Sequence, residues 1–349
     1  MSLVLSTSNY TQFEKDFFVT EAVIGLDTVN AGLMYVATGV KNDQYSFPNL
    51  NANTRLQAFG STPSTRGTTT LSNRNITLGK FMGYEEFEPA IFENHWHVTQ
   101  LSDNLLKRSL PVTFQNYLTT YYTQKMFVPI EKMIHIGSTS YDTASGGSAQ
   151  PSTFNADGTI NVAGGVNEQN IYFDGIIKQA LNASTPALQV ASPVALTSAN
   201  IISKMEAAKV KLGTTTGGLA LLSRSDRYKR LKFIMGVLDY QKYEDALTTT
   251  TYKNNDTTEK GINRYKGYEV VVCAGIPENT FYFCEATTDL NSNLQLAVTD
   301  LDNLTFEINF LQNNSTKYFY KCLMKMGVGI AKPQEFVIYT TMVLADFSA

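Results

Sequence analysis

The clearest hydrophobic pattern of the chain lies in its C-terminal stretch, residues 301 to 349. Apolar side chains at Leu304, Phe306, Ile308 and Phe310 alternate with polar ones, and a period of two predicts a half-buried strand. A polar turn at 312–316 and a mostly apolar run at 318–330 follow. They predict a long hairpin, and the run 336–339 predicts one more, returning strand with buried character.

A second strand pair is predicted near the N-terminus, with far less apolar content. Pro48 disfavours helix at Phe47, so residues 45–50 are expected to be extended. A Gly- and Pro-rich turn region at 60–67 leads into a Thr-rich strand at 68–78. A two-stranded ribbon of this kind is barely stable alone. We expect it to pack on something else, the alternative being a piece of an ordinary β-meander.

Two segments show helical spacing of apolar residues. The run Pro111–Val128 has aromatic residues at intervals of three and four, with Ser109 as a cap and Pro129 where the helix ends or kinks. Residues 173–181 are expected to begin a helix-containing domain. The segment 201–212 is amphipathic and ends at Gly213.

The remaining elements of the second half are shorter. Residues 219–222 predict a buried strand, 223–236 a further helix, and the residues up to Glu259 a polar loop. Strands are expected within 261–272 and at 281–284. Helices around a small sheet give a layered α+β architecture.

Composition narrows the function classes. Charged residues make up only 17% of the chain, against roughly 25% in typical soluble domains. A low-charge surface suits a chain that buries its exterior against neighbours, although an ordinary β-rich domain has the same composition. The net charge is −3 and there is no basic stripe, which argues against a protein that grips nucleic acid.

Candidate chemistry is sparse. His95 and His97 would share one face of a strand, but the chain has only one other His, at 135, so polar surface or interface histidines are favoured over a metal site. The paired glycines lack the Lys-Ser/Thr of a phosphate loop, and no Gly-x-Ser-x-Gly elbow occurs. We therefore predict no catalytic, cofactor or metal site, and no enzyme activity.

The cysteines and the hydropathy give two further expectations. Cys273, Cys284 and Cys322 are odd in number, widely spaced and set in apolar contexts, which predicts buried thiols in a reducing compartment. No run of eighteen apolar residues exists, so no membrane span and no membrane partner are expected.

The C-terminal stretch resembles the end of tailed-bacteriophage major capsid proteins of the Hong Kong 97-type fold. The resemblance rests on 315–322, on 327–333 and on 336–338, and it extends to the order of elements at 42–135 and 170–340. It implies an N-terminal arm at 1–41 and an extended loop at 42–88. It also implies a peripheral domain at 89–150 and 291–326, with 111–128 as its spine helix, and an axial domain at 151–290 and 327–349.

The resemblance also implies a function. Copies would assemble into hexamers and pentamers of an icosahedral virion shell, built in the host cytoplasm. The shell would enclose double-stranded DNA without sequence-specific binding, and scaffold, portal and decoration proteins are candidate further partners. The contacts between subunits are expected at the extended loop and at the peripheral hairpin tip, through the following residues: Phe47, Phe59, Arg66, Leu71, Asn313 and Asn314.

Two alternatives remain open at this stage. An encapsulin-like compartment would share the fold and enclose protein cargo in place of DNA. A β-rich tail or structural protein would give fibres, rings or tubes.

Some family members join a loop Lys to a peripheral Asn with the help of a Glu. Here the loop tip carries Arg66, and the strand after the Asn turn carries Lys321 and Lys325, so crosslinking of this kind is not expected.

Overall fold

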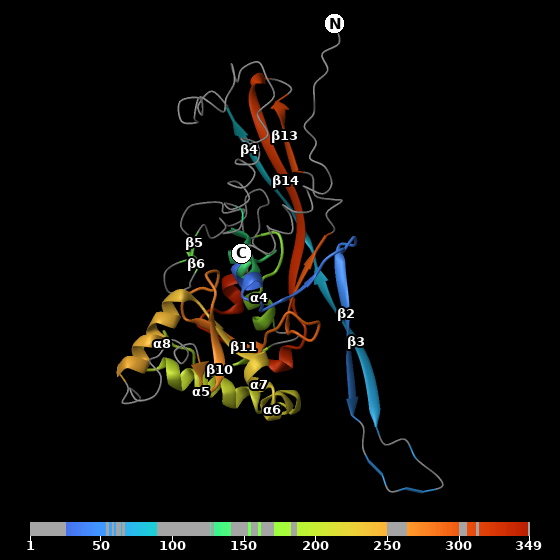
Figure 1. Cartoon of the computed structure of the whole chain (residues 1–349), viewed down its shortest axis with the longest axis vertical. Helices are drawn as coiled ribbons and strands as arrows, with labels where there is room; N and C mark the ends of the chain where they lie inside the picture. Colours follow the sequence, from blue (N-terminus) through green and yellow to red (C-terminus); the bar gives the residue numbers. More distant parts are fainter. Residues whose placement is uncertain are drawn as a thin grey trace.

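The computed structural model describes residues 26–53, 56–57, 59–60, 64, 67–88, 126, 129–140, 153–154, 160–161, 171–182, 187–249, 264–299, 306–311 and 314–347. These residues form a body of helices around a sheet, a long second sheet and a projecting hairpin (Figure 1). A short β5–β6 pair (Thr153–Phe154 and Ile160–Asn161) stands apart from both sheets.

The body is built on a mixed six-stranded sheet with the order β7-β15-β11-β8-β10-β9. Its strands are β7 (Leu188–Gln189), β15 (Phe336–Thr340), β11 (Thr280–Glu285), β8 (Leu231–Met235), β10 (Tyr268–Val272) and β9 (Arg264–Tyr265). β8 runs parallel to β10 and antiparallel to β11. The sheet therefore joins strands from residues 188 to 340 into one unit.

Both faces of this sheet are covered. Along β8, Leu231, Phe233 and Met235 belong to one buried cluster and Ile234 belongs to the other. The first face packs on α5 (Ile201–Leu212), α6 (Thr216–Ser223) and α8 (Val237–Thr249). The second packs on α4 (Ile176–Leu181), on the helical residues 129–136 and on the long sheet. Such burial on both faces explains why β8 reads as a nearly continuous apolar run.

The long sheet is organised by β14 (Asn314–Ile330), the central strand of this part of the molecule. β4 (Gly79–Phe87) pairs along one edge, while β12 (Leu294–Val298) and β13 (Phe306–Leu311) pair one after the other along the opposite edge. β1 (Tyr35–Ala37) extends the sheet beside β12. Alternate residues of β14 from Tyr318 to Met326 are buried, so one face lies on the core and the other is partly open.

Several predictions are confirmed. β13, β14 and β15 reproduce the predicted C-terminal hairpin and returning strand, and α5 has the predicted bounds 201–212. Ile201, Met205, Ala208 and Leu212 are its buried residues, as its spacing requires. The three cysteines are free and buried, and burial raises the pKa of each thiol.

Three predictions in the body are wrong. Residues 219–222 lie in helix α6, whose N-terminus is capped where the Thr215 hydroxyl accepts a hydrogen bond from the Gly218 amide at 3.1 Å. Residues 223–236 were expected to be helical, but only α7 (Arg227–Arg230) is, and 231–235 form strand β8. The expected polar loop before Glu259 contains α8 at 237–249. Short apolar runs fit a buried helix and a buried strand equally well, and neighbours decide between them.

Part of the predicted arm belongs to the body. Short helix α2 (Asp27–Asn30) and β1 are tied to the core by Leu26, Leu33 and Met34, each at most 1% exposed. Residues 1–25 lie outside the described residues, as do His95, His97 and all of the predicted spine helix except Met126. Helical structure does continue past Pro129, since 129–136 are helical.

Candidate interaction surface

The projecting hairpin consists of β2 (Gln44–Asn53) and β3 (Thr68–Thr77), paired antiparallel from Gln44↔Thr77 to Asn53↔Thr68. It leaves the body beside the long sheet and ends in a loop far from the core (Figure 1). Because side chains alternate between faces along a strand, this register sorts the hairpin residues into two sets. The two sets have different surroundings.

The first set of residues packs against the rest of the subunit at the root of the hairpin. Tyr45, Phe47 and Ile76 pack in a small cluster of their own, with the following residues of the long sheet and of the segments next to it: Ala37, Val40, Leu78, Ala297 and Ala331. Phe47 is only 6% exposed. The aromatic ring of this predicted contact residue is therefore buried inside its own chain.

Two glycines of β14 allow this close crossing. A Cβ on Gly327 would lie 2.4 Å from the Thr77 carbonyl oxygen, and one on Gly329 would lie 2.5 Å from Cγ1 of Ile76. Any side chain at either position would push the hairpin away from β14. The Gly-x-Gly spacing within an apolar strand is a signal of close backbone approach that the sequence already carried.

The second set is exposed. Leu50 and Leu71 stand directly opposite each other in the register, and they are 66% and 68% exposed. Leu56 and Phe59, in the connection between the strands, are 98% and 106% exposed. The exposed residues Leu50 and Leu71 form a small apolar patch on this face of the hairpin.

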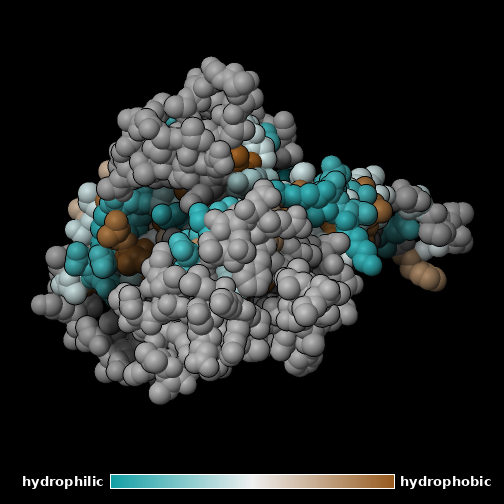
Figure 2. Space-filling view, turned by 90° about the horizontal axis from the view of Figure 1, so that it is seen from above, coloured by the Kyte–Doolittle hydropathy of each residue, from teal (hydrophilic) through white to brown (hydrophobic). Residues whose placement is uncertain are grey.

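The hairpin is also charged with one sign. Between Gln44 and Leu78 the sequence holds Arg55, Arg66 and Arg74 and no Asp or Glu. The chain as a whole has more acidic than basic residues, 31 against 28. Viewed from above, the described part of the projection is mostly hydrophilic, with small hydrophobic groups (Figure 2). A partner surface with carboxylates would complement it.

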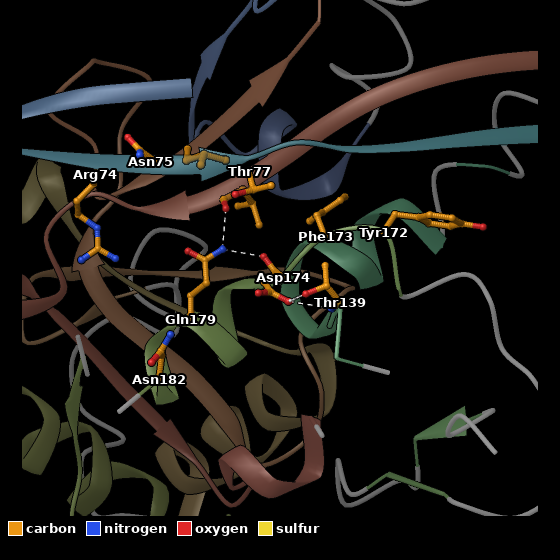
Figure 3. A pocket seen from close by; sticks show the side chains of 11 residues that line it. Arg74, Asn75, Thr77, Thr139, Tyr172, Phe173, Asp174, Gln179 and Asn182 are labelled. Atoms are coloured by element: carbon orange, nitrogen blue, oxygen red, sulfur yellow. Dashed lines mark hydrogen bonds between the residues drawn. The ribbon is translucent and has the colours of Figure 1, made fainter. Parts of the chain in front are cut away.

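A polar pocket of 290 Å³ lies where the hairpin root meets α4 and β14. Gln179 lies at its centre and donates through Nε2 to the carbonyl oxygens of Asp174 and Val328, each at 2.7 Å (Figure 3). The Asp174 carboxylate accepts hydrogen bonds from the amide and hydroxyl of Thr139, both at 2.8 Å. These bonds fix the wall on which the hairpin rests.

Arg74 lines the same pocket from the hairpin side (Figure 3). Its side chain is half-buried, and this burial lowers the pKa of the guanidinium. It makes no ion pair with any described residue. The root pocket thus holds both this guanidinium and the Asp174 carboxylate, which do not pair with each other.

A second polar cluster is buried beneath α2. Glu131 and His135 lie one helical turn apart, with His135 Nε2 3.4 Å from Glu131 Oε1. Thr28 donates its amide and its hydroxyl to the same Glu131 oxygen, and Tyr282 hydrogen-bonds His135 Nδ1 at 3.3 Å. Burial alone would raise the pKa of Glu131, but the hydrogen bond and charge of His135, together with Thr28, lower it. With His135 fully buried, the cluster is closed to a substrate and ties α2 to the body.

The structure places the predicted contact residues as follows. Phe59 and Leu71 are exposed on the hairpin, and Phe47 is buried at its root. Arg66 and Asn313 lie outside the described residues, and Asn314 begins β14 opposite Leu311. The sequence reasoning missed Leu50 and Leu56. Leu50 could have been found from strand pairing, had the register been known.

Two further observations concern the described residues only. Among them, no group of three or more His, Cys, Asp or Glu side chains is placed to hold a metal ion. None of their helices is long and apolar enough to cross a membrane.

Comparison with known proteins gives the fold. No protein-family model and no curated protein matches the sequence. The capsid of a native GTA particle is similar with 9% identity and a TM-score of 0.51, covering 97% of this chain and 93% of that one. The procapsid of satellite phage P4, solved with its size determination protein, is similar with 11% identity and a TM-score of 0.51, covering 94% and 99%. These likenesses confirm the predicted α+β capsid fold of the Hong Kong 97 type.

Proposed function

We propose that this chain is the major capsid protein of a tailed bacteriophage. Copies of it assemble into the hexamers and pentamers of an icosahedral shell that encloses double-stranded DNA. The shell is built in the host cytoplasm and becomes part of the virion. The protein acts as a structural component and not as an enzyme.

One observation carries the proposal: within this fold, the β2–β3 hairpin projects from the body, and the well-buried apolar residues in its described part, Phe47 and Ile76, lie at its root. Its distal half exposes Leu50, Leu71 and Phe59. A ribbon that cannot bury itself gains stability from another surface. In a shell of identical subunits, that surface is supplied by a neighbouring copy, and many modest contacts of this kind add up to a stable closed particle.

The charge of the hairpin suggests where it docks. Strand β4 forms one edge of the long sheet in its described part, and it exposes Glu85 and Glu86. A hairpin with three Arg and no carboxylate would be complementary to this edge on a second copy. Leu71, Leu50, Phe59 and Arg66 are the proposed contacts of the loop. Asn313 and Asn314 remain proposed contacts of the β13–β14 tip.

The test is electron microscopy of the full-length chain, with light scattering for mass. We expect closed spherical particles, or rings of five and six. Deleting Gly60–Gly67 should leave a folded subunit by circular dichroism but no closed shells. Tubes or fibres from the intact chain would contradict the proposal and favour a tail or structural protein.

The contents of the particles separate the two shell functions. Particles isolated with nuclease-protected double-stranded DNA support the phage capsid. Particles that instead enclose a defined protein cargo would contradict it and favour an encapsulin-like compartment.

A further inference from the structure

In the buried cluster beneath α2, the hydrogen bonds of the Glu131 carboxylate fall on one of its two oxygens. Oε1 accepts from the Thr28 amide at 3.1 Å and from the Thr28 hydroxyl, and it lies 3.4 Å from Nε2 of His135. Oε2 is buried and has no hydrogen-bond partner in the described part of the chain. Donors from α2 and from the helical residues 129–136 therefore converge on a single carboxylate oxygen.

The cluster is shielded from solvent on every side that the structure describes. Thr28 and His135 are fully buried, and Glu131 is 5% exposed. Tyr282 of β11 contacts Nδ1 of His135 at 3.3 Å. The turn after β10 packs so closely that a Cβ on Gly275 would lie 2.7 Å from Cδ2 of His135 and 2.8 Å from Cγ of Glu131. With so little water around it, a change of charge on Glu131 acts directly on its protein partners.

Other titratable side chains surround the cluster from three elements. They come from α2, from the turn after β10 and from β11: Asp27, Cys273, Tyr282 and Cys284. Burial raises the pKa of the two thiols and of the phenol, so all three stay uncharged in acid. Asp27 is exposed, and its carboxylate accepts from the Ala274 amide at 2.9 Å. In the described part of the chain Glu131 pairs with no Lys or Arg, so its charge is balanced by His135 and the Thr28 donors.

The ionised form of Glu131 is the one that holds α2. Hydrogen bonds to a charged acceptor are about twice as strong as neutral ones. Burial alone would raise the pKa of Glu131, but the hydrogen bond and charge of His135, together with the Thr28 donors, lower it below the ordinary value of 4.5. The stability that the carboxylate gives to the docked state is therefore fully present above pH 4.5 and is lost as the pH falls below it.

We propose that Thr28, Glu131 and His135 form an acid-released latch, in which the Glu131 carboxylate holds α2 on the body and its protonation lets α2 open while the body stays folded. A proton on Oε2 would meet no acceptor in the described part of the chain, and Oε1 would become a weaker acceptor for Thr28. The apolar contacts of Leu26 and Leu33 with the core remain, so the released state is a more frequent local opening. The latch belongs to the single subunit and operates whether or not shells form.

Hydrogen exchange of the full-length chain, followed from pH 7 to about pH 4 and corrected for the intrinsic pH dependence of amide exchange, tests the latch. The amides of Asn30, Ala31 and Leu33 report on α2, because they donate to carbonyl oxygens within residues 26–28. We expect their opening to increase about tenfold below pH 4.5, while β8 and β11 keep their protection. An unchanged α2, or equal acceleration in β8 and β11, would overturn the proposal. A change centred near pH 6.5, the ordinary value for histidine, would also overturn it, by assigning the effect to His135.

Three variants give an independent readout. Glu131→Gln keeps the shape and removes the charge, so α2 should open about tenfold more often at pH 7 and show no further change in acid. The matched control Asp27→Asn removes the exposed carboxylate of α2 and should keep the pH-dependent change. Thr28→Val removes a hydrogen bond that lowers the pKa of Glu131, so the change should move to higher pH. This last variant tests the latch even if Glu131→Gln does not fold. A change that persists in Glu131→Gln, or that disappears in Asp27→Asn, would contradict the latch.

Discussion

The six-stranded sheet and the β2–β3 hairpin use the same backbone hydrogen bonds and differ in what covers them. In the sheet, Phe233 and its neighbours on both faces are fully buried. In the hairpin, all the described residues of β3 from Thr68 to Asn73 are exposed. Hydrogen bonds exchanged with water contribute little net stability, whereas buried apolar area contributes much.

The difference assigns separate roles to the two regions. The sheet and its helices stabilise the subunit, because their apolar side chains are buried within one chain. In the part that the structure describes, the hairpin packs on the rest of the subunit at its root, and β3 from Thr68 to Asn73 is exposed. Substitutions in the sheet should therefore mainly change folding stability, and substitutions in the distal hairpin should mainly change assembly. The following variants test this difference.

The largest effect on folding is expected for Phe233→Ala. The ring stacks on Phe283 at a centroid distance of 4.2 Å and contacts Tyr265, Tyr268 and Phe281. Its removal leaves a cavity between the sheet and its helices, at a cost of about 3–5 kcal/mol. Urea unfolding followed by circular dichroism measures the loss. Phe59→Ala, at a fully exposed hairpin position, is the matched control and should change the unfolding free energy by less than about 0.5 kcal/mol.

A smaller and local effect is expected for Phe47→Ala. This ring belongs to the small root cluster and lies 6.2 Å from the ring of Tyr45. Its loss should release the hairpin from β14 while the body stays folded, since local opening needs less free energy than global unfolding. Hydrogen exchange should speed up in β2 and β3 and stay unchanged in β8 and β11. Equal acceleration in both regions would show that the hairpin and the body unfold together.

Elements whose structure depends on residues close by in the sequence were predicted better than elements whose structure depends on distant residues. The alternation at 304–310 and the helical spacing of 201–212 need no distant partner, and both elements were predicted correctly. Leu231–Met235 was predicted as helix because a run buried on both faces has no clear period of two. Only its pairing with Val270 and Phe283, far away in the chain, makes it a strand.

The same difference between local and distant determinants applies to the candidate interaction surface. Phe59 and Leu71 were predicted as contacts because they are isolated apolar residues in a polar ribbon, and both side chains are exposed. Phe47 was expected at an interface, but its alternation places it on the face that meets Ile76 and Ala297. Which face of a strand turns inward depends on the crossing at Gly327 and Gly329, and that crossing is a tertiary property.

A weaker effect on the subunit is expected when Leu50 and Leu71 are both replaced by Ser. The two side chains are exposed, so the unfolding free energy of the subunit should change by less than about 0.5 kcal/mol. Closed particles should nevertheless be lost or become fewer, because the cross-strand pair would otherwise be buried against a neighbour. Sedimentation and electron microscopy measure this. The control Asn73→Ser, on the same face of the hairpin, should assemble normally, and normal assembly of the double variant would remove the pair from the proposed interface.

The smallest effect on the unfolding free energy is expected for the charge of Glu206, at the margin of the buried six-stranded sheet. Glu206 of α5 accepts hydrogen bonds from Lys266 at 2.8 Å, Lys209 at 3.0 Å and the Tyr265 hydroxyl at 3.0 Å. The bond from Lys266 contributes most and outweighs the opposing effect of burial, so the pKa of Glu206 falls to about 2. The folded state thus holds this carboxylate ionised more strongly than the unfolded state does. The resulting stability is fully present above the unfolded pKa of about 4.5 and is lost as the pH falls toward 2.

Glu206→Gln should therefore lower the unfolding free energy at pH 7 by less than about 1 kcal/mol, since solvent screens this partly exposed group. The difference from the unmodified chain should shrink as the pH is lowered from 4.5 toward 2. Urea unfolding of both proteins across this range measures it, and Lys266→Met should shrink the same pH-dependent difference by removing its main cause. A difference independent of pH would mean that Glu206 stabilises α5 by packing and not by charge. Apolar contacts would then stabilise the six-stranded sheet even at its margin, and its contrast with the exposed hairpin would be sharper.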